Sequence, residues 1–235
     1  MTAQQIITEI EPLGTEGYRR ILRNHGVTGP LFGVKISELK KYEKAIKKNY
    51  QLALDLFDTG VYDAQYLAGL IADEKKMTKE DLRNWLSRAG SDTVSEYAVA
   101  WVAADGPYGW ELGLEWIESS QEREALVGWS TLSSWVSVKE DSELDVPTLR
   151  KLLERVTNTI HAQHDKVRYN MNGFVTCVGC YVRELKVEAM AAGEEIGIVK
   201  VDMGNTACKV PFSPDYIHKV DSMGRVGKKR KTARC

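Results

Sequence analysis

The sequence predicts an all-α fold in which paired helices stack into a curved solenoid. Apolar residues recur along most of the chain at the three- and four-residue spacing of one helix face. Turn-forming stretches interrupt this pattern at intervals of roughly 30 to 40 residues, a period typical of stacked helical hairpins. With 235 residues, 43% of them hydrophobic, the chain is long enough for one folded unit with a sizeable core.

The first part of the chain is expected to form three helical pairs. A first pair ends at the turn-rich stretch 24–30, and residues 37–40 open a second pair whose outer face is rich in lysine. The third pair consists of helices at 51–57 and 62–71, separated by Thr59 and Gly60. A helix after Thr78 follows, because an acid three positions beyond a threonine is typical of a helix start.

Further helices are expected at 91–104, 110–117, 121–138, 148–162 and 168–192. Pro147, directly after Asp145, suits the first position of the fourth of these. Loose alternation at 196–202 is compatible with a short strand, and residues 213–215 cap a last helix at 216–223. The predicted division is a repeat domain at 1–192, an extension at 193–224 and a basic tail at 225–235.

Charge is unevenly distributed, although the formal net charge is only −1. The last eleven residues hold six cations and no acid. These are Arg225, Lys228, Lys229, Arg230, Lys231 and Arg234. Such a run attracts phosphate, and Lys228 to Lys231 are therefore candidate DNA-binding residues; the alternative is a solvated terminus.

The N-terminal segment lacks the pattern of a secretory signal, and no apolar stretch reaches the length of a membrane span. We therefore expect a cytoplasmic protein, nucleoid-associated in a bacterium, with no membrane partner and with its four cysteines as thiols. His161, His164, Cys177 and Cys180 have ligand-like spacing. Because the cysteines lie in an apolar helical stretch, we predict no metal site and no cofactor.

Aromatic and acidic residues cluster between positions 85 and 135. Trp101 and Trp129 are candidates for an aromatic wall on which a base stacks, the alternative being packing between helices. Asp92 and Glu96, four residues apart, are candidate catalytic carboxylates that offset positive charge during glycosidic cleavage, or else part of a solvated face. Polar residues of the last long helix suit phosphates or base edges. These are Arg168, Tyr169, Asn172 and Arg183.

Four stretches resemble the AlkD-like DNA alkylation repair family, which is built of HEAT-like helical repeats, over most of residues 1–192. Residues 31–39 and 53–60 are similar to early segments of that family. Ser91-Asp-Thr-Val-Ser95 corresponds to the family's Trp-Asp-x-Val-Asp, and Gly179-Cys-Tyr-Val-Arg-Glu184 to its Gly-Trp-x-Leu-Arg-Glu.

The resemblance implies a DNA groove in which active members use a Trp, an Asp, an Arg and a second Trp. Carried over, these positions are Ser91, Ser95, Arg123 and Cys180, so three of the four depart from the pattern. The expected function is therefore binding of damaged or structured DNA in a concave groove, with Arg123, Arg168 and Arg183 on phosphates. Two alternatives remain: excision of N3- or N7-alkylated purines, and a helical scaffold that binds a protein partner.

Overall fold

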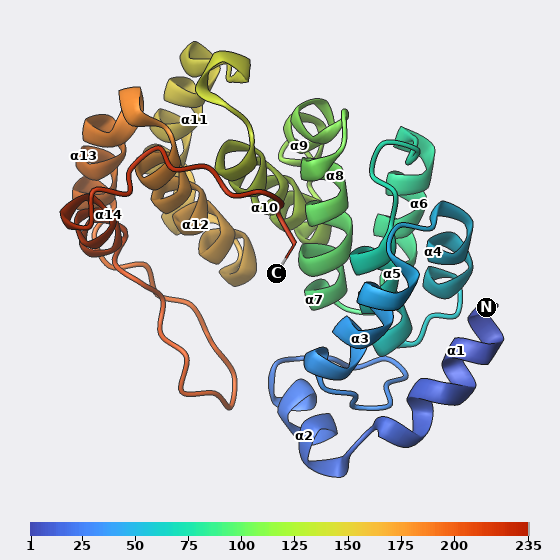
Figure 1. Cartoon of the computed structure of the whole chain (residues 1–235). Helices are drawn as coiled ribbons and strands as arrows, with labels where there is room; N and C mark the ends of the chain where they lie inside the picture. Colours follow the sequence, from blue (N-terminus) through green and yellow to red (C-terminus); the bar gives the residue numbers. More distant parts are fainter. Residues whose placement is uncertain (235) are drawn as a thin grey trace. The chain divides into compact units, whose positions relative to one another are not determined.

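The computed structural model describes residues 1–234, which form helices and loops without any strand. The chain divides into two compact units, whose helices are labelled in Figure 1. Unit 1 comprises residues 1–108, 203–207 and Arg234, and unit 2 comprises residues 109–202 and 208–233. The predicted all-helical class is confirmed. The short strand expected at 196–202 is absent, because Gly197, with a φ of 68°, ends a helix and irregular backbone follows.

Unit 1 contains the first eight helices. They are α1 (Ala3–Ile10), α2 (Glu16–Asn24), α3 (Ile36–Ile46), α4 (Tyr50–Phe57), α5 (Tyr62–Ile71), α6 (Lys79–Arg88), α7 (Asp92–Val94) and α8 (Trp101–Asp105). A 3-10 turn, η1 (Glu11–Leu13), follows α1, and a π-helical segment, η2 (Ser95–Ala100), joins α7 to α8. Thr78 and Asp81 form the expected reciprocal cap of α6.

Helix α5 is the centre of unit 1, since every one of its residues is buried. Its only carboxylate, Asp63, accepts hydrogen bonds from the amides of Phe32 at 2.6 Å and Val34 at 2.7 Å. These bonds satisfy a buried charge and hold the loop before α3 against the core. Elsewhere in the unit the rings of Phe57 and Trp85 stack at 4.2 Å.

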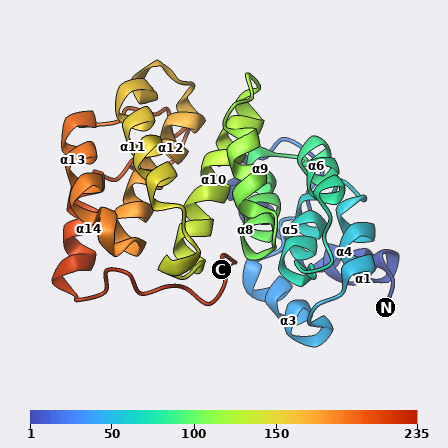
Figure 2. The same cartoon turned by 90° about the horizontal axis from the view of Figure 1, so that it is seen from above.

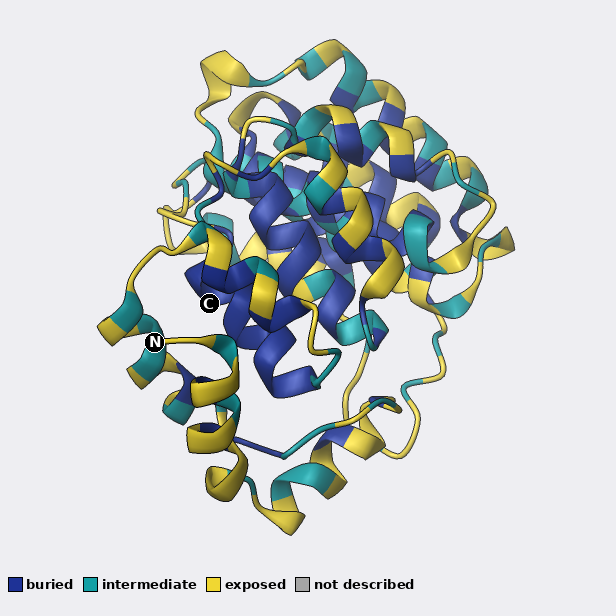
Figure 3. Ribbon diagram, turned by 90° about the vertical axis from the view of Figure 1, so that its right-hand side faces the viewer, coloured by how far each residue is buried: buried dark blue, intermediate teal, exposed yellow. Residues whose placement is uncertain are grey.

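Unit 2 contains α9 (Gly109–Trp116), α10 (Glu122–Val138), α11 (Val146–Thr159), α12 (Asp165–Tyr181), α13 (Lys186–Ile196) and α14 (Ser213–Ser222). Its 3-10 turns are η3 (Asp141–Glu143), η4 (Ile160–Ala162) and η5 (Arg183–Leu185). Helix α10 packs between α9 and α12, as Figure 2 shows. Figure 3 shows buried residues, in dark blue, along helix faces turned toward other helices, with exposed residues, in yellow, on the opposite faces. As predicted, Pro147 lies in the first turn of α11 behind the Asp145 cap.

Two helix predictions in unit 2 are wrong. The single helix expected at 168–192 breaks at Val182, whose backbone is extended, so that α13 can pack on both α11 and α12. The last helix begins at Ser213 rather than at 216. The Ser213 hydroxyl does not cap it, because it donates to the Asn172 side chain at 2.7 Å instead. Both differences arise from contacts between helices, which local sequence does not report.

Candidate nucleic-acid interface

Ser91 and Ser95, to which the resemblance carries over a Trp and an Asp of the glycosylases, are both buried, one at each end of the short helix α7. The Ser91 hydroxyl caps the helix by accepting from the Val94 amide at 3.2 Å. The Ser95 hydroxyl donates to the Ser91 carbonyl at 3.2 Å. Both side chains are therefore used in local hydrogen bonds, and neither supplies a carboxylate or an aromatic face.

The candidate carboxylates Asp92 and Glu96 are half-exposed and both interact with other groups of the protein. Glu96 lies in the π-helical segment η2, where the helix is wider than an α-helix. The α-helical spacing assumed for this pair therefore does not hold. Beside them Tyr97 is 42% exposed, with its ring 5.0 Å from that of Trp101. A role for these acids in catalysis stays a prediction.

The aromatic wall expected from Trp101 and Trp129 is replaced by core packing. Trp101 is only 7% exposed and meets Tyr66 edge to face at 6.1 Å. Trp129 is 2% exposed and packs against Phe174 at 5.2 Å. Neither ring presents a face on which a base could stack. In the region of η2, Tyr97 is the aromatic residue that reaches the surface.

The polar residues proposed on α10 and α12 have different environments. Arg123 is half-exposed near the start of α10 and interacts within the protein. Arg168 forms an ion pair with Asp165, and Tyr169 is exposed. Asn172 is buried, and its amide donates to the Pro211 carbonyl at 2.9 Å. Asn172 thus holds the segment before α14 in place, and its role in this structure is structural.

Residues 227–230 of the basic run pack on the helices of unit 2. Gly227 donates its amide to the Cys180 carbonyl at 2.8 Å. Lys229, with a side chain only 6% exposed, donates to the carbonyls of Val136 at 3.0 Å and Tyr181 at 2.8 Å. Its ammonium also pairs with Asp141 at 2.8 Å. Lys229 therefore anchors this segment and has no remaining donor for DNA.

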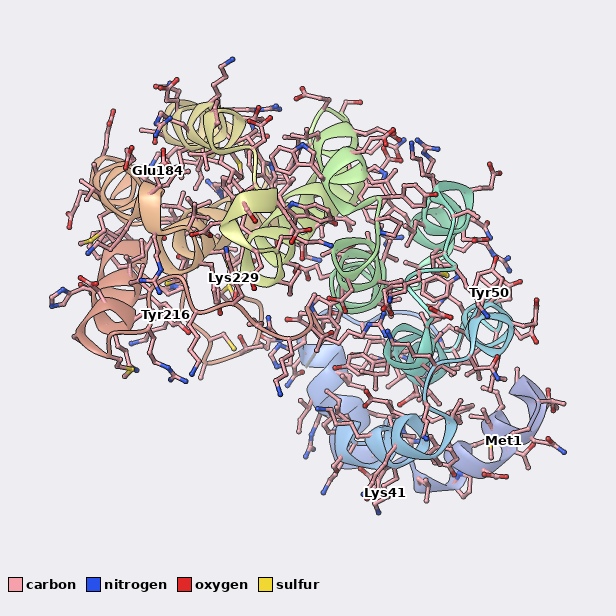
Figure 4. All side chains as sticks on the ribbon, turned by 45° about the horizontal axis from the view of Figure 1, so that its top comes forward. Met1, Lys41, Tyr50, Glu184, Tyr216 and Lys229 are labelled. Atoms are coloured by element: carbon pink, nitrogen blue, oxygen red, sulfur yellow. The ribbon has the colours of Figure 1, made fainter. Side chains whose placement is uncertain are left out.

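A cavity of about 470 Å³, here called the basic pocket, lies between α12, α14 and residues 225–230. Its lining is Cys180, Tyr181, Tyr216, Lys219, Val220, Met223, Arg225, Lys228, Lys229 and Arg230. Figure 4 labels Tyr216 on α14 and Lys229 on the terminal segment, on the same side of unit 2. Two other cations predicted to bind DNA, Lys231 and Arg183, are exposed and do not line the pocket. The Arg183 side chain lies against Gly227.

Sequence reasoning missed six residues that line the basic pocket: Tyr181, Tyr216, Lys219, Val220, Met223 and Arg225. A signal for four of them was present. Tyr216, Lys219, Val220 and Met223 recur at the three- and four-residue spacing of one helix face, and all four line the cavity. Arg225 follows that face directly and could have been grouped with it.

Thiol chemistry and metal binding are not favoured at this site. Burial raises the pKa of Cys180 to about 11 and that of Cys177 to about 12, so both are neutral thiols near pH 7. His161, one of the two histidines considered as ligands, has its Nε2 2.9 Å from the Ile196 carbonyl oxygen. Across residues 1–234 no three His, Cys, Asp or Glu side chains gather closely enough to hold a metal ion.

Comparison with known proteins identifies the family of this chain. A family model described as "DNA alkylation repair enzyme" matches residues 6–192. This chain belongs to the DNA alkylation repair family. An uncharacterized protein of Listeria monocytogenes is 32% identical and one of Listeria innocua 31% identical, each alignment covering 93% of this chain and 97% of the relative.

A solved structure is similar to this chain over its full length. It represents a family of proteins related to the HEAT-like repeat DNA glycosylases, with affinity for branched DNA structures. That protein is 32% identical, both chains are covered completely, and the TM-score is 0.91. The HEAT-like repeat fold expected from the sequence is thereby confirmed. In addition, no helix within residues 1–234 is long and apolar enough to cross a membrane.

Proposed function

We propose that this protein binds branched or otherwise structured DNA through its phosphates and does not excise bases. The observation that carries the proposal is the position of Cys180. It stands where glycosylase members of the family carry a DNA-contacting Trp, and here it lines a pocket that also holds Lys219, Arg225 and Lys228. Cationic side chains around a family DNA-contact position are suited to phosphate binding.

The absence of base excision is supported by the other family positions. Ser91 and Ser95 are buried and hydrogen-bonded to the backbone of their own helix. Neither can offset the positive charge that develops on the sugar during glycosidic cleavage, for which a carboxylate is required. Affinity for branched DNA in the solved relative supports the binding part of the proposal.

A binding experiment tests the proposal. Full-length protein is titrated against a four-way junction, a flapped duplex and a linear duplex over a range of salt concentrations. Branched DNA is expected to bind more tightly than linear duplex. The Arg225→Ala/Lys228→Ala variant is expected to lower the slope of log affinity against log salt by about one for each phosphate that is no longer neutralised.

The control variant is Lys40→Ala/Lys151→Ala, which removes two exposed positive charges at a distance in the sequence from the pocket. It should leave the preference for branched DNA unchanged. An equal decrease in affinity in both variants would show that DNA binding depends on the net charge of the protein and not on the basic pocket. Failure to bind any DNA at low salt would favour the scaffold alternative, and release of 3-methyladenine or 7-methylguanine from methylated duplex would favour the glycosylase alternative.

A further inference from the structure

The basic pocket has the size of a small-ligand site. Its volume of about 470 Å³ falls within the range of roughly 300 to 1,000 Å³ that is usual for sites that enclose a small molecule or one nucleotide. Its walls are fixed by ordered contacts: α14 packs on α12 and α13, and Lys229 ties the terminal segment to Val136 and Tyr181. The cavity is therefore largely preformed.

The positive charge of the pocket is not balanced by acidic residues in its lining. Five of its lining residues are cationic and none is acidic. Lys229 is paired with Asp141, and Arg230 donates to the Ala233 carbonyl at 3.2 Å. The side chains of Lys219, Arg225 and Lys228 form no ion pair or hydrogen bond with any of residues 1–234. Three neighbouring cations without a counter-charge favour an anion carrying more than one charge.

One wall of the pocket is aromatic and apolar. Tyr216 is 51% exposed and Met223 is also exposed, both on the face of α14 that carries Lys219. An exposed ring beside cations offers a planar base a stacking surface next to its phosphate, as in sites for single-stranded nucleic acid. An acidic peptide would use the cations but would gain little from this wall.

We infer that the basic pocket receives the terminal phosphate of a DNA strand together with its end nucleotide. This inference rests on the proposed function and specifies which part of a structured DNA molecule enters the site. A terminal phosphate carries about −1.5 to −2 charges and three accepting oxygens, whereas an internal phosphodiester carries a single charge. The pocket is bounded by α12, α14 and residues 225–230 and is open elsewhere. A chain end enters such a site more readily than an internal phosphate, whose strand must leave in both directions.

The test compares flapped duplexes that differ only at the strand end. The ends are 5′-phosphate, 3′-phosphate, 5′-methylphosphate and hydroxyl, and affinity for the full-length protein is measured by fluorescence anisotropy. We expect one phosphate end to bind about tenfold more tightly than the hydroxyl end. The methylphosphate end, which has one charge fewer, should show little of that preference.

Variants locate the effect in the pocket. Lys228→Ala and Arg225→Ala should each abolish most of the preference for the phosphate end, and Tyr216→Ala should weaken binding of that end by roughly tenfold. The matched control Lys231→Ala removes an exposed cation of the same segment that does not line the cavity, and it should keep the preference. Circular dichroism checks that each variant is folded.

Two results overturn the inference while leaving the proposed function intact. One is equal affinity of the wild-type protein for all four ends with retained binding of branched DNA. The other is competition by an oligoglutamate peptide as strong as that by the phosphorylated strand end. Loss of all DNA binding, by contrast, would overturn the proposed function as well.

Discussion

The resemblance places functional positions of the glycosylases both at the short helix between Ser91 and Ser95 and in the basic pocket. The two regions differ in whether their side chains remain available to a ligand. In the first region two hydroxyls are buried and bonded to their own helix. In the second, Cys180 lines a cavity in which three cations have no partner within the described chain. A side chain already satisfied inside the protein contributes stability, whereas an unbalanced charge at the surface is available for a ligand.

The same contrast occurs within the basic run itself. Lys228 is exposed and lines the pocket, whereas the side chain of its neighbour Lys229 is buried against two carbonyls and Asp141. Arg234 is buried within unit 1, where it pairs with Glu74 at 2.9 Å and Asp105 at 3.3 Å. The six cations therefore include at least two whose role is structural.

The largest expected effect is on the free energy of unfolding, at Trp129. It tests whether this ring belongs to the core or to a DNA-binding surface. Trp129→Ala should lower the free energy of unfolding by about 3 to 5 kcal/mol, because it removes a buried ring from between α10 and α12. Urea denaturation measures this decrease. Tyr97→Ala, at an exposed ring, is the control and should cost much less. If Trp129→Ala were as stable as the wild type but bound DNA much more weakly, Trp129 would contact DNA and the aromatic-wall hypothesis would be correct.

A smaller effect is expected when the family acid is placed in the serine pair. Ser95→Asp should destabilise the protein by roughly 1 to 3 kcal/mol, because the new carboxyl is removed from water at a fully buried position. Burial raises the pKa of the introduced carboxyl above its unfolded value, so the folded state binds more protons and stability falls as pH rises.

Thermal denaturation between pH 4 and pH 8 distinguishes charge from shape at this position. Ser95→Asn, which introduces nearly the same shape as aspartate and no charge, should lower stability by a constant amount across that range. Stability of Ser95→Asp that is independent of pH, or base release from methylated duplex by this variant, would show that the region is more open than its burial indicates.

The smallest effect tests the contrast between adjacent lysines. Lys229→Met should lower the free energy of unfolding by about 1 to 3 kcal/mol, since two carbonyls would then lack their charged donor. Lys228→Met should leave stability within about 0.5 kcal/mol of the wild type, as expected for a surface site. Denaturation curves and salt-dependent DNA binding, measured on both variants, check the pair. Equal stability of the two would contradict the anchoring role of Lys229.

Most helices could be predicted because their signals are local. The reciprocal cap at Thr78 and Asp81, and Pro147 behind Asp145, mark helix starts through neighbours in sequence. The break at Val182 and the early start of α14 at Ser213 were missed because each depends on a helix packed from elsewhere in the chain. The local sequence pattern around these residues carries no information about such contacts.

The site was predicted less completely, for the same physical reason. Composition correctly indicated a concentration of positive charge near the C-terminus, and four short stretches indicated the family. Nothing in the order of residues distinguishes Lys228 from Lys229 or assigns Trp129 to the core. The spacing of Tyr216 and Lys219 groups them on one helix face but does not show that this face borders a pocket.

Residue order alone was sufficient for the helical class and the family. These follow from periodicity, caps and short motifs, all of which act over a few residues. The folded molecule was needed to learn which charges remain unpaired and which aromatic rings are exposed. Burial and pairing depend on surfaces brought together from distant parts of the chain, as when Gly227 meets Cys180 and Asn172 meets Ser213.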